Sequence, residues 1–104
     1  MYIIEYLSDA LEDLKEITSY ITNNLQNPSA AKKNYMEIIA EIESLSDFPY
    51  SAPIYYPLRP LKKEYRKLLV NNYLIFYWVC EKAKTVTIAR IIYARRNISR
   101  ILEA

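Results

Sequence analysis

Four prolines between Asp47 and Pro60 divide the chain into two parts with different residue patterns. Proline interrupts a regular helix and removes a hydrogen-bond donor from a central strand, so we predict a long, partly ordered loop here. Tyrosines lie between the prolines, and Phe48 directly precedes the first of them. Because long loops are where contacts vary most easily, this segment is a natural place for binding.

The part before the loop opens with a predicted strand and a helix. Residues 2–7 are rich in aromatic and β-branched side chains, which favour a strand. Ser8 and Asp9 follow as candidate N-caps. Apolar residues then recur at helical spacing from Leu11 to Leu25, which predicts an amphipathic helix that ends in a polar, asparagine-rich stretch.

A second helix is predicted directly after this stretch. Asn27 and Pro28 are typical of a helix start, since proline is favoured in the first turn. An apolar stripe at helical spacing runs from Ala31 to Leu45. Neither helix is apolar on every side, so the pair should form a hairpin that packs on a sheet.

The part after the loop predicts three strands and a short basic helix, over residues 65–70, 73–80, 85–93 and 97–103. Asn71 and Asn72 tolerate the left-handed backbone of a tight hairpin. The run from Tyr73 to Cys80 is almost wholly apolar, which indicates a central strand with Ile75, Phe76 and Trp78 in the core. The element order is β-α-α-β-β-β-α, a single α+β domain over residues 1–104.

Three absences narrow the possible chemistry. The chain has no histidine, no glycine and a single cysteine, Cys80. A catalytic triad, an ordinary zinc site, a P-loop and a dinucleotide fingerprint are therefore excluded, and we expect neither a metal nor a cofactor. The lone cysteine fits a reducing cytoplasm, and no apolar run approaches the roughly 18 residues of a membrane helix. We therefore expect a cytoplasmic protein without a membrane partner.

Charge is distributed unevenly along the chain. Residues 1–52 carry nine acidic and three basic side chains, a net charge of −6, whereas residues 53–104 carry eleven basic and three acidic ones, a net charge of +8. A basic half of this size suits a polyanion or an acidic protein partner. The alternative is that the two halves neutralise each other within the fold.

Two stretches of sequence, together with the element order, resemble the RelE/ParE superfamily of bacterial toxins. Residues 65–77 read YRKLLVNNYLIFY, which is a basic strand, a turn and a strand that opens and closes on tyrosine. Residues 88–98 read IARIIYARRNI, a strand that ends on an aromatic residue before a pair of arginines. The likeness covers nearly the whole chain.

The resemblance implies a helical hairpin packed on a four-stranded, mainly antiparallel sheet, and a cognate antitoxin that silences the toxin. It also implies one of two targets, because ParE-like members inhibit DNA gyrase and RelE-like members cut ribosome-bound mRNA. Leu74 stands where the nucleases often carry arginine, and Ile101–Glu103 stand where they carry a catalytic group. We therefore favour the ParE-like interpretation, with the ribonuclease as the alternative and a degenerate, non-toxic binding module as a third.

The candidate binding residues come from the basic half: Lys62, Lys63, Arg66, Lys67, Arg90, Tyr93, Arg95 and Arg96. In a ribonuclease, Arg66, Lys67 and Arg96 would be the catalytic groups, because cations stabilise the charge of a phosphorane. Glu64 is the one candidate general base. A carboxylate among cations is better suited to a structural role than to taking up a proton, so we expect Glu64 to act like a helix cap or to form a salt bridge.

Local rules constrain several of these residues. Arg66 and Lys67 alternate along a strand, so only one of them should face a groove. Arg90 lies within an apolar strand and must be paired or reach solvent. Arg95 and its neighbour precede a predicted helix, where the helix dipole disfavours cations, which favours a bound anion. Tyr93 either stacks on a base or covers the edge of the core.

Overall fold

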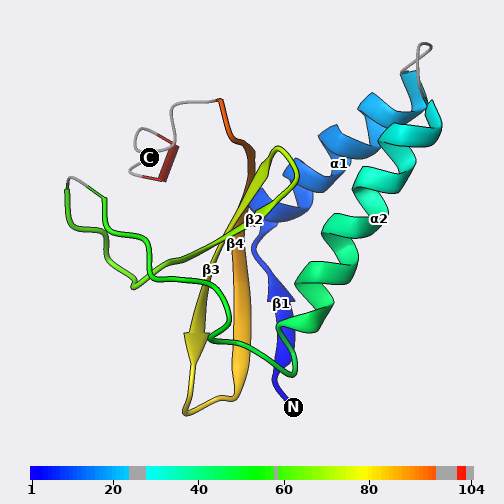
Figure 1. Ribbon diagram of the computed structural model, residues 1–104. Coiled ribbons are helices and arrows are strands. Elements are labelled where there is room, and N and C mark those ends of the chain that lie inside the picture. Colours follow the sequence, from blue (N-terminus) through cyan, green and yellow to red (C-terminus); the bar gives the residue numbers. More distant parts are fainter. Residues whose placement is uncertain (24–27, 58, 96–100, 103–104) are drawn as a thin grey trace.

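The computed structural model describes residues 1–23, 28–57, 59–95 and 101–102 (Figure 1). Its elements are β1 (Ile3–Tyr6), α1 (Ser8–Asn23), α2 (Pro28–Ser44), β2 (Arg66–Val70), β3 (Tyr73–Cys80) and β4 (Thr85–Tyr93). The predicted order of strands and helices is thus confirmed up to β4. The predicted C-terminal helix lies mostly outside the described residues, of which Ile101 and Leu102 are helical.

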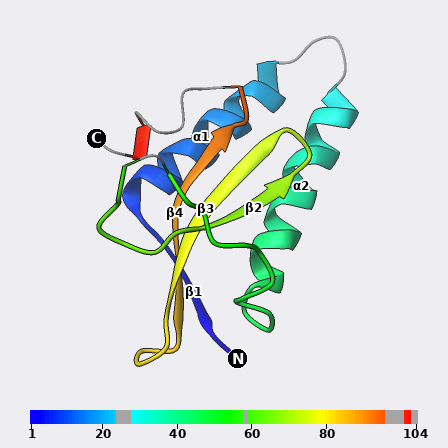
Figure 2. The same ribbon diagram turned by 60° about the vertical axis from the view of Figure 1, so that its left-hand side comes forward.

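The four strands form one mixed sheet in the order β1-β4-β3-β2. β1 runs parallel to β4, while β2 and β4 both pair with β3 in antiparallel fashion, so the sheet is mainly antiparallel as expected. β1 is short and covers only Thr85 to Ile88 of β4. The remaining half of β4 therefore has no strand on that side, and α1 packs there instead, as Figure 2 shows.

The start of α1 differs from the prediction. Ser8 and Asp9 are the first two residues of the helix and not its caps. The Leu11 amide donates to the Leu7 carbonyl at 3.1 Å, so the chain turns into the helix one residue earlier. Asp9 then lies in the first turn, where the positive end of the helix dipole favours a carboxylate. α2 begins at Pro28, as predicted.

The main core lies between the helices and one face of the sheet. Its fully buried side chains include Ile38 and Ile42 of α2, Ile75 and Tyr77 of β3, and Ile88 of β4. The Tyr77 hydroxyl is satisfied in this core because it donates to the Pro49 carbonyl at 2.8 Å. That bond also fixes the start of the loop against β3.

A smaller cluster lies on the sheet face that points away from the helices. It consists of buried Leu74, Phe76 and Ile92, against which Tyr55, Tyr65, Ile101 and Leu102 pack. The loop and residues 101–102 lie on this side in Figure 1. Trp78 was expected in the core, but it is only half-buried, because the covering segments reach over Phe76 and leave the end of β3 partly open.

In two turns a residue other than glycine adopts the left-handed backbone conformation, because the chain has no glycine. Asn71 has a φ of 54° between β2 and β3, as the asparagine pair predicted, and Lys84 has a φ of 55° before β4. The Asn71 side chain donates to Asn34 at 2.7 Å and to Glu37 at 2.9 Å, which ties the hairpin to α2. Among the described residues no helix is long and apolar enough to cross a membrane.

Candidate binding face on the sheet

Three cations at the start of β2 lie over aromatic rings. Lys63 Nζ is 5.3 Å from the centre of the Trp78 ring, and Lys67 Nζ is 5.5 Å from that of Tyr55. The Arg66 guanidinium is 4.8 Å from the centre of the Tyr50 ring. The loop and β3 supply the rings. In the sheet register Arg66 lies opposite Tyr77 of the helix-side core and Lys67 opposite Phe76 of the outer cluster, so the cations belong to both sides of the sheet at β2.

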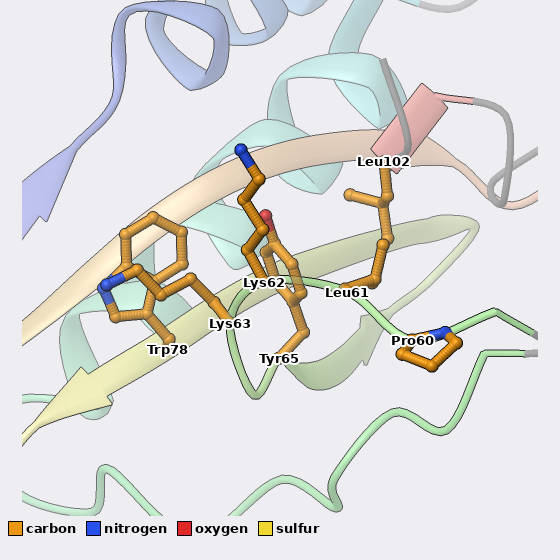
Figure 3. A pocket seen from close by; sticks show the side chains of 7 residues that line it. All are labelled: Pro60, Leu61, Lys62, Lys63, Tyr65, Trp78 and Leu102. Atoms are coloured by element: carbon orange, nitrogen blue, oxygen red, sulfur yellow. The ribbon is translucent and has the colours of Figure 1, made fainter.

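Two grooves open on this face. The larger, of about 560 Å³, is lined by Pro60, Leu61, Lys62, Lys63, Tyr65, Trp78 and Leu102 (Figure 3). The smaller, of about 340 Å³, is lined by Tyr50, Lys63, Glu64, Arg66, Trp78, Val79, Cys80, Thr85 and Thr87. Lys63 and Trp78 belong to both, so the two grooves are adjacent.

Arg66 is the member of its pair that lines a groove. Its Nη1 donates to the Ala52 carbonyl at 2.8 Å, which holds the guanidinium between the loop and β3. Lys67 lines neither groove and lies over Tyr55. The expectation that only one of the two faces a groove is therefore met.

Glu64 lines the smaller groove and is exposed. None of the ion pairs found in the described part of the chain involves Glu64, so the salt bridge expected from the sequence is absent there. Nor does the described part contain a cluster of three or more acidic or cysteine side chains that could hold a metal ion.

Arg90 lies away from both grooves and is paired within the fold. Its Nε donates to Asp13 Oδ2 at 2.8 Å and its Nη2 to Asp13 Oδ1 at 2.9 Å. The Ile91 amide donates to the same carboxylate at 2.8 Å. The hydrogen bonds that Arg90 donates to the Asp13 carboxylate raise the pKa of Arg90, so the guanidinium stays charged. The sequence-based expectation of a paired arginine is confirmed, with a partner 77 residues away.

The end of β4 carries the remaining candidates. Tyr93 is 38% exposed and packs edge-on against Tyr73, with ring centres 5.6 Å apart. Arg95 is exposed just after the strand. Neither lines the two grooves, and Arg96 lies outside the described residues. The structure therefore brings together Lys62, Lys63 and Arg66 but places Tyr93 and Arg95 elsewhere.

A cluster around Glu81 was not predicted. The Glu81 carboxylate accepts hydrogen bonds from the Tyr2 hydroxyl at 2.5 and 2.8 Å, from the Tyr50 hydroxyl, and from Lys84 Nζ at 2.8 Å. Figure 2 shows why they meet, since the β3–β4 turn lies at the N-terminal end of β1. Through Tyr50 the cluster also supports the ring beneath Arg66.

The hydrogen bonds of this cluster shift two pKa values in opposite directions. The bonds from Lys84 first, and then from Tyr2 and Tyr50, lower the pKa of Glu81 from 4.5 to about 2. The bond to Glu81 is the main reason that the pKa of Tyr50 rises from 10.0 to about 12. Both shifts favour the arrangement seen here, with a charged carboxylate and a neutral phenol.

The lowered pKa of Glu81 predicts how the free energy of unfolding changes at low pH. A carboxylate with a lower pKa in the folded state stabilises the fold above its unfolded pKa, and that contribution is lost as the pH falls through the folded value. We expect the free energy of unfolding of the wild type to fall toward that of Glu81→Gln as the pH is lowered from 4.5 to about 2. Denaturant titrations across this range measure the difference, with Glu5→Gln as an exposed control. Parallel curves for wild type and Glu81→Gln would contradict the prediction.

Comparison with known proteins gives a family match over most of the chain. The family model of the ParE toxin of the type II toxin–antitoxin system, parDE, matches residues 4–98. No curated protein matches the chain.

Solved structures with the same fold include toxins from three organisms. A chromosomal ParDE TA system from P. aeruginosa is 19% identical, with a TM-score of 0.67 over 91% of this chain and 98% of that one. A metal-bound toxin from Helicobacter pylori is 20% identical, with a TM-score of 0.62 over 89% and 94%. An archaeal RelE–RelB complex from Pyrococcus horikoshii OT3 is 15% identical, with a TM-score of 0.60 over 91% and 97%. At these identities the likeness shows the fold alone.

Proposed function

Because the chain belongs to the ParE toxin family of type II toxin–antitoxin systems, we propose that it arrests bacterial growth by inhibiting DNA gyrase. The observation that carries this proposal is the chemistry of the sheet face. Its cations lie over aromatic rings, and the one carboxylate in its grooves is the exposed Glu64. Such a face suits the binding of a large partner better than the cleavage of a bond.

The same residues argue against hydrolysis. Cleavage of RNA by its own 2′-hydroxyl needs a group that removes the proton and one that protonates the leaving oxygen. The chain has no histidine, and Arg66 is already bonded to the Ala52 carbonyl.

A ribosome-dependent endoribonuclease is the second candidate. The fold likeness to the archaeal RelE–RelB complex and the mixture of lysines and aromatic rings on the sheet face favour it, since RNA binds to such surfaces. In that case Arg66, Lys67 and Arg96 would stabilise the phosphorane. A degenerate module without toxicity is the third, and normal growth of cells that express soluble protein without its partner would support it.

Gyrase assays test the first candidate directly. Purified protein is expected to block supercoiling and to accumulate cleaved DNA. Arg66→Ala should weaken this inhibition by about tenfold, because a half-buried arginine at the centre of a binding face often carries much of the binding energy. Lys15→Ala, on the exposed side of α1, is the matched control.

Two outcomes would contradict the gyrase proposal. Growth arrest by a protein that leaves gyrase untouched at a large molar excess would exclude it. Codon-phased cuts in translated mRNA, found by primer extension and lost in Lys67→Ala, would support the ribonuclease instead.

We also propose that a cognate antitoxin covers this face with an acidic, amphipathic segment. The structures from P. aeruginosa and Pyrococcus horikoshii are of a ParDE system and a RelE–RelB complex, which supports a partner of this kind. The net charge of +8 on residues 53–104 supports an acidic one. Opposite charge would speed association, and apolar contacts would slow release.

A further inference from the structure

The two grooves adjoin at Lys63 and Trp78, and we call them together the two-part groove. Tyr65 packs edge-on against Trp78, with ring centres 5.7 Å apart, which helps to hold the indole in place. Figure 3 shows Lys63 beside Trp78 at one end of the larger groove, and Leu61 and Leu102 at the other. A bound chain that follows the surface must therefore pass this pair.

The two halves differ in chemistry. The larger half ends among aliphatic and proline side chains from Pro60, Leu61 and Leu102, which suits an apolar side chain. The smaller half contains Arg66 together with the hydroxyls of Thr85 and Thr87, which suits a carboxylate. An apolar anchor and an acidic group, a short distance apart on one ligand, would fill both halves.

The charge of the lining residues also favours a ligand with acidic groups. Lys62, Lys63 and Arg66 line the two-part groove against a single carboxylate, that of Glu64. Lys62 and Lys63 are exposed, and neither takes part in the ion pairs found among the described residues. The groove therefore has positive charge that the described part of the fold does not neutralise.

The cations also decide between a peptide and a nucleic acid. Bases bind to single-strand sites by stacking on open aromatic faces. In the two-part groove Lys63 already lies over Trp78 and Arg66 over Tyr50. Because the rings are covered by cations, the surface is better suited to carboxylates, which approach the cations directly.

We infer that the two-part groove binds an antitoxin segment in which an aliphatic side chain is followed closely by carboxylates. The aliphatic side chain packs between Leu61 and Leu102, and the carboxylates pair with Lys63 and Arg66. This inference rests on the antitoxin partner proposed above and names the sequence chemistry that the toxin selects. It is independent of the gyrase proposal, because it concerns occupation of the groove and not the target.

Trp78 makes the inference directly measurable, because it is the only tryptophan in the chain and lines both halves of the groove. The probes are short synthetic peptides without aromatic residues. One alternates leucine with glutamate, a second replaces each glutamate by glutamine, and a third replaces each leucine by serine. The first is expected to change Trp78 emission with saturation, and calorimetry on the full chain gives its Kd.

For each half of the groove we expect a separate loss of peptide affinity when the matching side chain of the peptide is changed. The glutamine peptide should bind about fivefold more weakly, as for a partly exposed charge pair, and the serine peptide at least about tenfold more weakly, as for lost aliphatic burial. Lys63→Ala should remove most of the preference for glutamate over glutamine. Lys82→Ala, in the exposed β3–β4 turn, is the control and should keep it.

Three results would overturn the inference. Emission that the leucine–glutamate peptide leaves unchanged would show that the groove is not its site. If Lys63→Ala and Lys82→Ala lost the preference for glutamate over glutamine equally, the preference would come from the overall charge of the protein and not from the groove. Tighter binding of a uridine oligonucleotide, with a change in Trp78 emission, would assign the groove to nucleic acid. None of these depends on whether gyrase is inhibited, so the two proposals can fail separately.

Discussion

Replacing Asp13 with alanine is expected to lower the free energy of unfolding by about 3 kcal/mol, or the melting temperature by about 15 °C. The Asp13 side chain is only 8% exposed and that of Arg90 is 22% exposed, so the pair is largely out of water. Its loss leaves a partly buried guanidinium and the Ile91 amide without their acceptor. Because the protein interior cannot hydrate these groups fully, the penalty exceeds that of a surface ion pair. Denaturant and thermal unfolding measure it.

A nearby exposed pair gives the control. Glu12 and Lys15 lie on α1 with their charged atoms 3.8 Å apart and their side chains 69% and 78% exposed. Glu12→Ala should change stability by less than about 0.5 kcal/mol. Adding Arg90→Met to Asp13→Ala should recover part of the loss, because the uncompensated charge is then gone. An effect of Asp13→Ala no larger than that of Glu12→Ala would contradict this account.

The Asp13–Arg90 pair also marks what the sequence could and could not predict. A guanidinium within an apolar strand must be paired or reach solvent, so a partner for Arg90 was one of the two expected outcomes. This rule could not name the partner, because the pairing depends on β1 ending opposite Ile88 and on α1 filling the space beyond it. The identity of the partner is thus a property of the packing of distant segments.

Elements with strong local signals were predicted closely. β3 begins at Tyr73 and ends at Cys80 as expected, because an apolar run between two polar turns leaves little freedom. The capping of α1 was wrong, because Ser8 and Asp9 were the expected caps but the Leu7 carbonyl accepts the hydrogen bond from the Leu11 amide. Trp78 was assigned to the core from its neighbours, but burial at a strand end depends on what covers it.

The sequence predicted which cations belong to the candidate site but not how they are arranged. The basic half gave Lys62, Lys63 and Arg66, which the structure brings together. The aromatic partners of these cations come from the loop and from β3, so spacing in the sequence carries no signal for them. The same holds for Glu81, whose hydroxyl donors lie 79 and 31 residues away along the chain.

Reversing the charge of Lys62 and Lys63 together is expected to slow association with the antitoxin at least about tenfold at low salt. Both lysines are exposed beside the grooves, where they would attract an acidic segment before contact. The wild-type association rate should also fall as salt is raised, because ions screen attraction beyond roughly 10 Å. Stopped-flow mixing of the full chain with the antitoxin encoded beside it measures both effects.

The chain contains a matched pair for this experiment. Lys32 and Lys33 are also adjacent and exposed, but they lie on α2, which packs on the other face of the sheet. Reversing them changes the net charge by the same amount, so a difference between the two double variants isolates position from total charge. At physiological salt we expect the change on α2 to leave the association rate within about twofold of the wild type, since distant exposed charges are then screened. Equal slowing by both variants, or a rate that salt does not alter, would show that the antitoxin is not guided by the charge of the sheet face.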